Sequence, residues 1–243
     1  MAKKPLYQEI CDKLTTSLVD GEWRPGEMLP SEPQLAKRYG VGISTVRAAV
    51  RELEVAKVLM RAQGKGTFVL HFDERESTHR FLNITRADGT AVPTDRKMVA
   101  LERVAAPADI AEALRLPRRG PKENTFKLTT VVRLEGMPVY YSNVFLPASI
   151  FSRLRKALLP DGGKALYSLY QQNFNVNVTK VIDSLSTVPA PAEAARLCGL
   201  RAGTCVLRLR RIAFTYNDLP VEVRTNWIST AKHCYRIVQG DHS

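Results

Sequence analysis

The chain has 243 residues, with 36 lysines and arginines against 24 aspartates and glutamates, which gives a formal net charge of +12 at pH 7. Its 44% hydrophobic and 25% charged residues exclude a disordered or fibrous chain and indicate a folded globular protein. No stretch approaches the roughly 20 apolar residues that cross a bilayer, and the start does not resemble a signal peptide, so we expect a cytoplasmic protein. The excess of positive charge favours a polyanionic partner.

The cysteines are widely spaced. Cys11, Cys198, Cys205 and Cys234 form no C-x-x-C pair and have no histidine cluster beside them. This spacing predicts reduced thiols, with neither a disulfide framework nor a structural zinc site.

The first 70 residues predict three helices and a hairpin. Apolar residues at a spacing of four predict a helix over residues 5–20, and Ser31 with Gln34 has capping-box spacing at the start of a second helix. A third helix is expected over residues 43–56. Short apolar runs at residues 58–60 and 67–70 flank a glycine-rich turn and predict a hairpin. This order of elements is typical of a winged helix-turn-helix, which we assign to an N-terminal domain over residues 1–70.

The third helix is the candidate for reading DNA, because a helix-turn-helix places its second helix in the major groove. Its apolar positions face inward, which leaves five residues on the outer side, Ser44, Thr45, Arg47, Ala48 and Arg51. Hydroxyl groups can bond phosphates or base edges, and an arginine can reach a guanine or a phosphate. The hairpin turn adds Lys65 beside Gly66, a cation on a narrow turn that fits a minor groove.

Beyond a polar linker at residues 71–79, the sequence becomes rich in short strands. Strands are expected over residues 98–104, 126–134, 138–146, 176–186, 205–216 and 221–228, and helices over 108–116, 150–159, 166–174 and 192–198. Strands interleaved with a few helices predict an α+β domain with a mostly antiparallel sheet over residues 80–243.

Several motifs of the N-terminal unit carry a family resemblance. Gly21-Glu-Trp-Arg-Pro-Gly26, Leu29-Pro-Ser-Glu32, Thr45-Val-Arg47 and Gly64-Lys-Gly-Thr-Phe68 resemble the GntR family of bacterial transcription regulators. The resemblance implies a homodimer, more often a repressor than an activator, that binds a short palindromic operator in double-stranded DNA. It also implies DNA contacts from the start of the second helix, from the third helix and from the wing. The candidate DNA-binding residues are therefore Ser31, Ser44, Thr45, Arg47, Arg51, Lys65 and Gly66.

Two positions depart from the family motif. Pro33 and Ile43 stand where arginines are common in the family. Each lost arginine would remove roughly 1–3 kcal/mol of base discrimination if it made a bidentate guanine contact. We therefore expect an operator that differs from the commoner family consensus.

The C-terminal region resembles the UTRA effector domain of the HutC-type branch of this family. The resemblance rests on Leu134-Glu-Gly-Met-Pro138, Leu166-Tyr167 and Leu219-Pro-Val-Glu222, among other short signatures. It implies a chorismate-lyase-like α+β fold that binds a small, often anionic metabolite and helps to dimerise the protein. Tyr167 and Glu222 match ligand-contacting positions, although a core aromatic and an outward solvated carboxylate remain the alternatives.

Other effector contacts are less clear from the sequence. Phosphate-binding relatives carry arginines or a serine where this chain has Thr130, Val132 and Ala165, so the usual phosphosugar clamp is not expected. Arg86, Thr130 and Ser142 join Tyr167 and Glu222 as the candidate effector-binding residues. Whether the Tyr140-Tyr141-Ser142 strand lines the pocket or the dimer interface stays open.

No recognisable catalytic motif occurs in the sequence. The four histidines lie in the linker or near the C-terminus, and there is no nucleophile elbow, P-loop, dinucleotide fingerprint or zinc motif. We expect no catalytic residue, metal or cofactor, and the predicted function is a metabolite-responsive, sequence-specific transcription regulator. An effector-independent DNA-binding protein and a lyase-like enzyme remain the alternatives.

Overall fold

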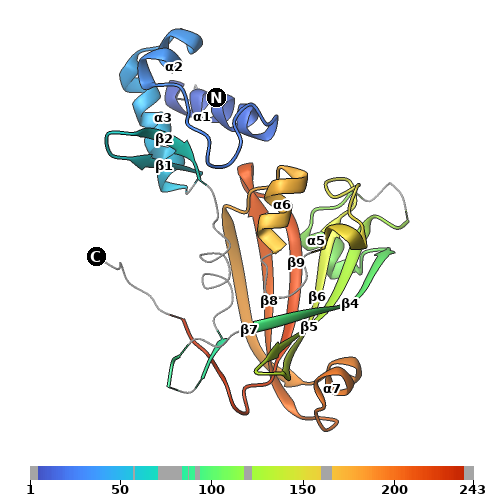
Figure 1. Ribbon diagram of the computed structural model, residues 1–243. Coiled ribbons are helices and arrows are strands. Elements are labelled where there is room, and N and C mark those ends of the chain that lie inside the picture. Colours follow the sequence, from blue (N-terminus) through green and yellow to red (C-terminus); the bar gives the residue numbers. More distant parts are fainter. Residues whose placement is uncertain are drawn as a thin grey trace.

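The computed structural model describes residues 5–56, 58–70, 84–86, 88–90, 94–117, 122–159 and 166–237. The predicted linker at residues 71–79 lies outside the described residues. Helices α1 to α3 and the β1–β2 hairpin form an N-terminal unit, and the later elements surround a six-stranded sheet (Figure 1).

Three helices build the N-terminal unit. They are α1 (Leu6–Val19), α2 (Glu32–Tyr39) and α3 (Ile43–Val55). The four apolar residues of α3 predicted to face inward, Val46, Ala49, Val50 and Leu53, are all buried, as are Ile10, Leu14 and Leu18 of α1. The helices therefore pack around one small core, as their apolar spacing predicts.

A short hairpin closes the unit. Strands β1 (Leu59–Ala62) and β2 (Gly66–Val69) pair in antiparallel fashion, one to two residues from their predicted positions. The backbone before α2 runs along β2, because Leu29 N donates to Thr67 O and Val69 N donates to Glu27 O. This pairing fixes the wing against the chain that leads into α2.

The C-terminal region holds a fully antiparallel sheet of order β4-β5-β6-β9-β8-β7. Its strands are β4 (Thr94–Val104), β5 (Thr125–Leu134), β6 (Met137–Pro147), β7 (Lys180–Pro189), β8 (Cys205–Thr215) and β9 (Leu219–Ile228). Two short strands absent from the prediction, β3 (Ile84–Thr85) and β10 (Cys234–Tyr235), pair separately. The predicted α+β class, with a helix-turn-helix followed by an antiparallel-sheet domain, is confirmed.

The two faces of the large sheet are covered by different helices. Helix α6 (Leu166–Phe174) packs on the face that carries Leu128, Val144 and Ala213. Helices α5 (Ala108–Ala113) and α7 (Ala192–Cys198) pack on the opposite face. In Figure 1, α6 lies at the end of the sheet nearest the N-terminal unit, and α7 lies at the far end.

One predicted helix is wrong. Residues 150–159 form turns and the short 3-10 helix η1 (Lys156–Leu158). The backbone of Arg155 is extended, at φ −146° and ψ 157°, and interrupts any helical run. Phe151 and Leu154 are buried at a spacing of three, and Leu154 N donates to Phe151 O as in a tight turn. Their apolar spacing therefore reflects two anchors of a turn.

Two predicted strands and one predicted helix have different boundaries in the structure. Strand β7 begins at Lys180, four residues later than predicted, because Val176 and Val178 pack in the core beside α6 and take no part in the sheet. Strand β8 ends at Thr215, and Tyr216 belongs to the 3-10 turn η2 (Tyr216–Asp218). Helix α5 is three residues shorter than predicted and is followed by Arg115 at a positive φ of 51°.

None of the helices in the described part of the chain has the length and apolar character needed to cross a membrane. Cys11, Cys198, Cys205 and Cys234 all lie in described segments, and none forms a disulfide.

Candidate nucleic-acid interface and effector site

The outer face of α3 carries the predicted DNA-reading residues. Ser44, Arg47 and Arg51 are exposed, and Thr45 is half-buried. Gly42 precedes the helix in an extended conformation, which an N-cap position requires. The helix therefore starts without a capping side chain and presents its first turn to solvent. Ile43 at its front is also exposed, where an arginine would have extended the polar surface.

Arg47 does not stand alone on this face. Its Nε lies 2.9 Å from Glu32 Oε2, and the other carboxylate oxygen of Glu32 lies 2.6 Å from Arg61 Nη2. Glu32 thus links α3 to β1, the first strand of the hairpin. Both arginines remain about half or more exposed. The carboxylate orients two cations that still face solvent, and sequence reasoning did not identify Glu32 or Arg61 in this role.

The start of α2 is built by a capping box. Ser31 N and Ser31 Oγ both donate to Gln34 Oε1, at 2.8 and 2.9 Å. The predicted cap is confirmed, and the hydroxyl hydrogen of Ser31 is already donated to Gln34. Ser31, Lys65 and Gly66 line one groove of about 580 Å³ between the wing and the start of α2. Three of the predicted DNA-contact residues therefore share one concave surface.

The wing turn has the geometry that its glycines allow. Gly64 and Gly66 adopt positive φ values of 71° and 123°, and Lys65 N donates to Ala62 O. A Cβ on Gly66 would lie 3.0 Å from Met28 Sδ, so this position also needs the absence of a side chain. Lys65 is exposed at the tip between them.

The second candidate site is a buried cluster around Glu222. This residue is 0% exposed, and its carboxylate accepts bonds from Tyr170 Oη at 2.5 Å and Tyr167 Oη at 3.3 Å. Arg224 Nη2 donates to it at 2.8 Å. The alternative of an outward solvated carboxylate is wrong, because β9 lies inside the sheet and is buried on both faces.

A second buried ion pair lies beside the first. Arg211 on β8 stands opposite Arg224 on β9, and its guanidinium binds Asp183 through two bonds of 2.6 and 2.7 Å. Two positive charges this close in a buried place destabilise the fold unless a carboxylate neutralises each of them. The cluster of Asp183, Arg211, Glu222 and Arg224 therefore has balanced charge.

The pKa shifts in this cluster follow from burial and the same charges. Burial, together with the negative charge of Glu222, raises the pKa of the Tyr167 and Tyr170 phenols far above their usual value. Burial opposes the charged form of Arg224, yet the neighbouring Glu222 raises its pKa overall. The hydrogen bonds to Asp183 similarly raise the pKa of Arg211 against the effect of burial. Both guanidiniums remain charged, and both phenols remain neutral donors.

A row of polar side chains crosses the sheet next to this cluster. Thr130, Ser142 and Asn226 are paired in register on β5, β6 and β9, so they share one face of the sheet. All three are buried. Arg224 lies on the same face, two residues before Asn226 on β9. Asn226 Oδ1 and Arg224 Nε have no hydrogen-bond partner among the described residues. Polar groups buried without partners are rare and costly, so this row is a candidate contact surface for a polar ligand.

Arg86 lies apart from the other four effector candidates. It pairs with Glu135 and donates to Thr90 in an exposed turn. In the sheet, Val223 beside Glu222 lies level with Phe145 of β6 and Lys127 of β5. Glu135, the partner of Arg86, comes eight residues after Lys127, beyond the end of β5. The structure therefore groups Thr130, Ser142, Tyr167 and Glu222 and does not bring Arg86 to them.

Successive side chains of a strand point to opposite faces of the sheet, so Tyr140 and Ser142 lie on one face and Tyr141 on the other. Tyr140 packs with Ile84 and Leu209 on the same face as Ser142. Tyr141 faces α7, where its hydroxyl donates to Glu193 Oε2 at 2.5 Å, and burial raises its pKa. Of the three, Ser142 alone adjoins the buried polar cluster.

The sequence missed Asp183, Arg211, Arg224 and Asn226. The available signal was the i, i+2 spacing of Glu222, Arg224 and Asn226, which places three polar side chains on one face of one strand. No group of three or more histidine, cysteine or acidic side chains in the described segments is arranged to hold a metal ion.

Comparisons with known proteins bear on both sites. The family model described as bacterial regulatory proteins of the gntR family matches residues 6–69, and the UTRA domain model matches residues 93–233. The chain belongs to the GntR family. Because it joins a GntR DNA-binding domain to a UTRA effector domain, this GntR protein is a metabolite-responsive DNA-binding transcription regulator and not an enzyme.

Characterised relatives resemble this GntR chain over nearly its whole length. The transcriptional regulator SmoD of Agrobacterium fabrum is 25% identical over 96% of both chains. A protein of Escherichia coli named as the probable transcriptional repressor of the fructoselysine utilization operon is 29% identical, over 90% of this chain and 88% of its own length.

Solved structures show the same folds. The ligand-binding domain of a GntR-family regulator from Bordetella bronchiseptica is 29% identical, with a TM-score of 0.61 over 66% of this GntR chain and 98% of that domain. PhnF from Mycobacterium smegmatis is 21% identical, with a TM-score of 0.54, and covers 97% of this chain and 99% of its own. The PhnF likeness concerns the fold alone.

Proposed function

We propose that this protein is a cytoplasmic homodimeric repressor of the HutC-type branch, which binds a palindromic operator and is regulated by a small hydroxylated metabolite. The DNA-binding domain is assigned to residues 1–70, the linker to residues 71–79 and the effector domain to residues 80–243. The repressor named for the E. coli fructoselysine operon supports the choice of repression. The observation that carries the DNA assignment is the exposed Arg47 held by Glu32 on the face of α3.

Operator contact is assigned to the surface formed by α3, the start of α2 and the wing. Ser44, Thr45, Arg47 and Arg51 contact the major groove, Ser31 contacts the backbone at the start of α2, and Lys65 and Gly66 enter the minor groove. A dimer presents two such surfaces, which fit half-sites about one helical turn apart. Light scattering tests the assembly, since a dimer has twice the chain mass of 27.2 kDa.

The effector is assigned to the buried cluster on the sheet face under α6. Thr130, Ser142, Tyr167 and Glu222 contribute the contacts predicted from the sequence, and Arg224 and Asn226 are added because each has a buried polar atom without a partner. Arg86 is left out.

The chemistry of the cluster favours a hydroxyl-rich effector without net charge over the anionic one that the resemblance implies. Each of the two buried arginines already has its own carboxylate. The polar groups that remain are hydroxyl, amide and a single guanidinium Nε–H, which hydrogen-bond sugar-like hydroxyls well. A phosphate would instead need unpaired positive charge.

Thermal unfolding with a metabolite panel tests this function. The panel holds neutral sugars and sugar–amine conjugates, their phosphate esters and simple carboxylates. At 100 times its Kd a true effector stabilises the native protein by about 2.7 kcal/mol. We expect the largest shift from an uncharged hydroxylated compound and its loss in Ser142→Ala. A shift produced by phosphate esters alone would contradict the proposed chemistry.

A further inference from the structure

The DNA-binding unit and the sheet domain are joined through Tyr216. This residue belongs to η2, the turn after β8, yet it is 7% exposed and lies in the same buried cluster as Leu14 and Leu18 of α1. Its hydroxyl accepts a hydrogen bond of 3.2 Å from Asn177 Nδ2. Asn177 is 2% exposed, so the bond is shielded from water. The sheet domain therefore contributes a side chain to the core of the DNA-binding unit.

A second contact lies at the end of α1. Asn175 Nδ2 donates to Leu18 O at 3.3 Å and to Val19 O at 3.0 Å. Carbonyls at a helix C-terminus lack partners within the helix, so a side-chain amide is a suitable cap for them. Asn175 directly follows α6 and adopts a left-handed conformation at φ 52°, which asparagine tolerates better than most residues.

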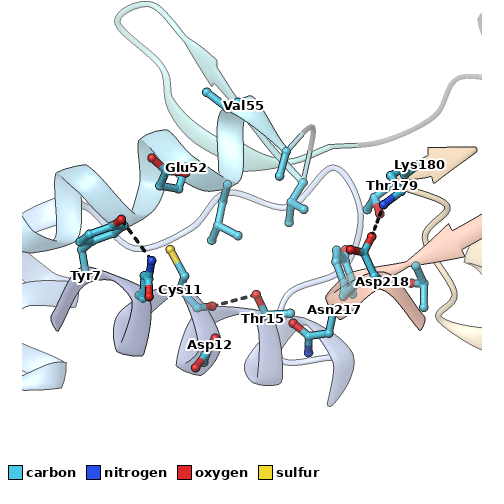
Figure 2. Close-up of a pocket in the computed structure, with 16 residues that line it drawn as sticks. Tyr7, Cys11, Asp12, Thr15, Glu52, Val55, Thr179, Lys180, Asn217 and Asp218 are labelled. Carbon is cyan, nitrogen blue, oxygen red and sulfur yellow. Dashed lines mark hydrogen bonds and ion pairs between the residues drawn. The ribbon is translucent and has the colours of Figure 1, made fainter. Parts of the chain in front are cut away.

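Open space borders both contacts. A cavity of about 660 Å³ is lined by Tyr216, by α1, by the end of α3 and by η2. Figure 2 shows the side chains that line it. The ion pair of Lys180 with Asp218 lies on the side of this cavity away from Tyr7. A second cavity, of about 850 Å³, lies by Asn175 between residues 20–25 and the end of α6. The DNA-binding unit is thus held by a narrow contact, with room to move on either side.

Helix α6 connects this contact to the Glu222 cluster. Tyr167 and Tyr170 of α6 bind Glu222, and the next residue, Gln171, donates through Nε2 to Asn177 Oδ1 at 3.4 Å. Gln171 is buried, and its Oε1 has no partner among the described residues. One short helix therefore carries the groups that bind Glu222 and the group that binds the partner of Tyr216.

We propose that Asn177 and Tyr216 are positioning residues that hold the DNA-binding unit in one orientation, and that α6 makes this orientation depend on the Glu222 cluster. The inference rests on the proposed function, in which the effector binds at that cluster. An effector that takes over a tyrosine bond to Glu222 shifts α6. Gln171 moves with α6 and displaces Asn177, and the hydrogen bond between Asn177 and Tyr216 changes. Asn175, which caps the end of α1, directly follows α6 and therefore moves with it.

Hydrogen exchange on the full chain tests the coupling without DNA or effector. The readout is exchange at the end of α1, where Asp20 N donates to Thr16 O and Glu22 N donates to Ser17 O. Tyr216→Phe removes only the hydroxyl and keeps the ring packed. We expect it to speed exchange there at least threefold. Gln172→Ala, an exposed neighbour on α6, is the matched control and leaves exchange unchanged.

The link to the effector site is tested by Tyr170→Phe in two backgrounds. We expect it to speed exchange at the end of α1 about threefold in the natural protein and less than 1.5-fold in Tyr216→Phe. Equal effects in both backgrounds, no effect of Tyr216→Phe, or an equal rise throughout β6 would overturn the proposal. A chain that shows the coupling but binds no DNA would instead contradict the proposed function.

Discussion

Glu32 Oε2 accepts a hydrogen bond from Arg47 Nε across 2.9 Å, so the first residue of α2 orients the central arginine of α3. An arginine held in one orientation loses less freedom when it forms a bidentate contact with guanine. We expect Glu32→Gln to lower the ratio of operator affinity to non-specific affinity about tenfold, which is about 1.4 kcal/mol and within the usual value of one base contact.

Glu54→Gln is the matched control for this prediction. It removes the same charge near Arg61, whose Nε lies 3.7 Å from Glu54 Oε1, and it leaves the bond between Arg47 and Glu32 in place. Both substitutions remove a negative charge beside DNA and raise non-specific affinity, but only Glu32→Gln reduces discrimination. Equal binding ratios for the two variants, measured by fluorescence anisotropy, would show that orientation of Arg47 contributes nothing.

The operator is expected to differ from the commoner family consensus. Pro33 and Ile43 stand near the start of α2 and α3, where arginines are common in the family, and Ile43 is exposed at the front of α3. Selection of bound sequences from a random DNA pool measures the preference. Recovery of the common consensus unchanged would refute the prediction.

Glu222 is expected to contribute strongly to stability. Glu222→Ala leaves Arg224 charged and buried without its carboxylate, a change that typically lowers the free energy of unfolding by about 3–5 kcal/mol. Glu102→Ala, on the exposed surface of β4, is the control and changes stability by less than about 0.5 kcal/mol. Urea unfolding gives both values. Similar losses in the two variants would contradict the structural role of the buried pair.

Alkaline pH is expected to destabilise the protein through its buried tyrosines. The pKa of Tyr170 is raised by burial and by Glu222, whereas the unfolded chain has a tyrosine pKa near its ordinary value of about 10. The unfolded state therefore loses protons first. Stability is complete below about pH 10 and falls as the pH rises above it, by up to about 1.4 kcal/mol per pH unit for each such tyrosine. We expect Tyr170→Phe to show a shallower fall between pH 10 and 11, and equal slopes would be the contrary result.

The DNA-binding unit was predictable because its structure is local. The inward positions Val46 and Val50 follow from helical spacing, and the cap at Ser31 depends on a residue three positions away. The bond between Arg47 and Glu32 was not predictable, because it depends on how α2 and α3 cross.

The buried cluster around Glu222 was only half predictable, for a similar reason. Glu222 is buried because strand order places β9 inside the sheet, and alternation along a single strand cannot show this. Arg211 reaches the cluster because it pairs with Arg224, thirteen positions later in the sequence, and no local rule fixes that pairing. Tyr216 was assigned to a strand, although it packs in the core of the other unit.

The most direct test of the account is binding to the DNA fragments that flank this protein's own gene, titrated at two salt concentrations with the natural protein and with Arg47→Ala. We predict tight binding to one fragment and a loss of about tenfold or more on substitution, with a smaller loss on the other fragments. Weak binding to every fragment, steeply dependent on salt and indifferent to Arg47, would show non-specific charge attraction and contradict the assignment of α3 as the recognition helix.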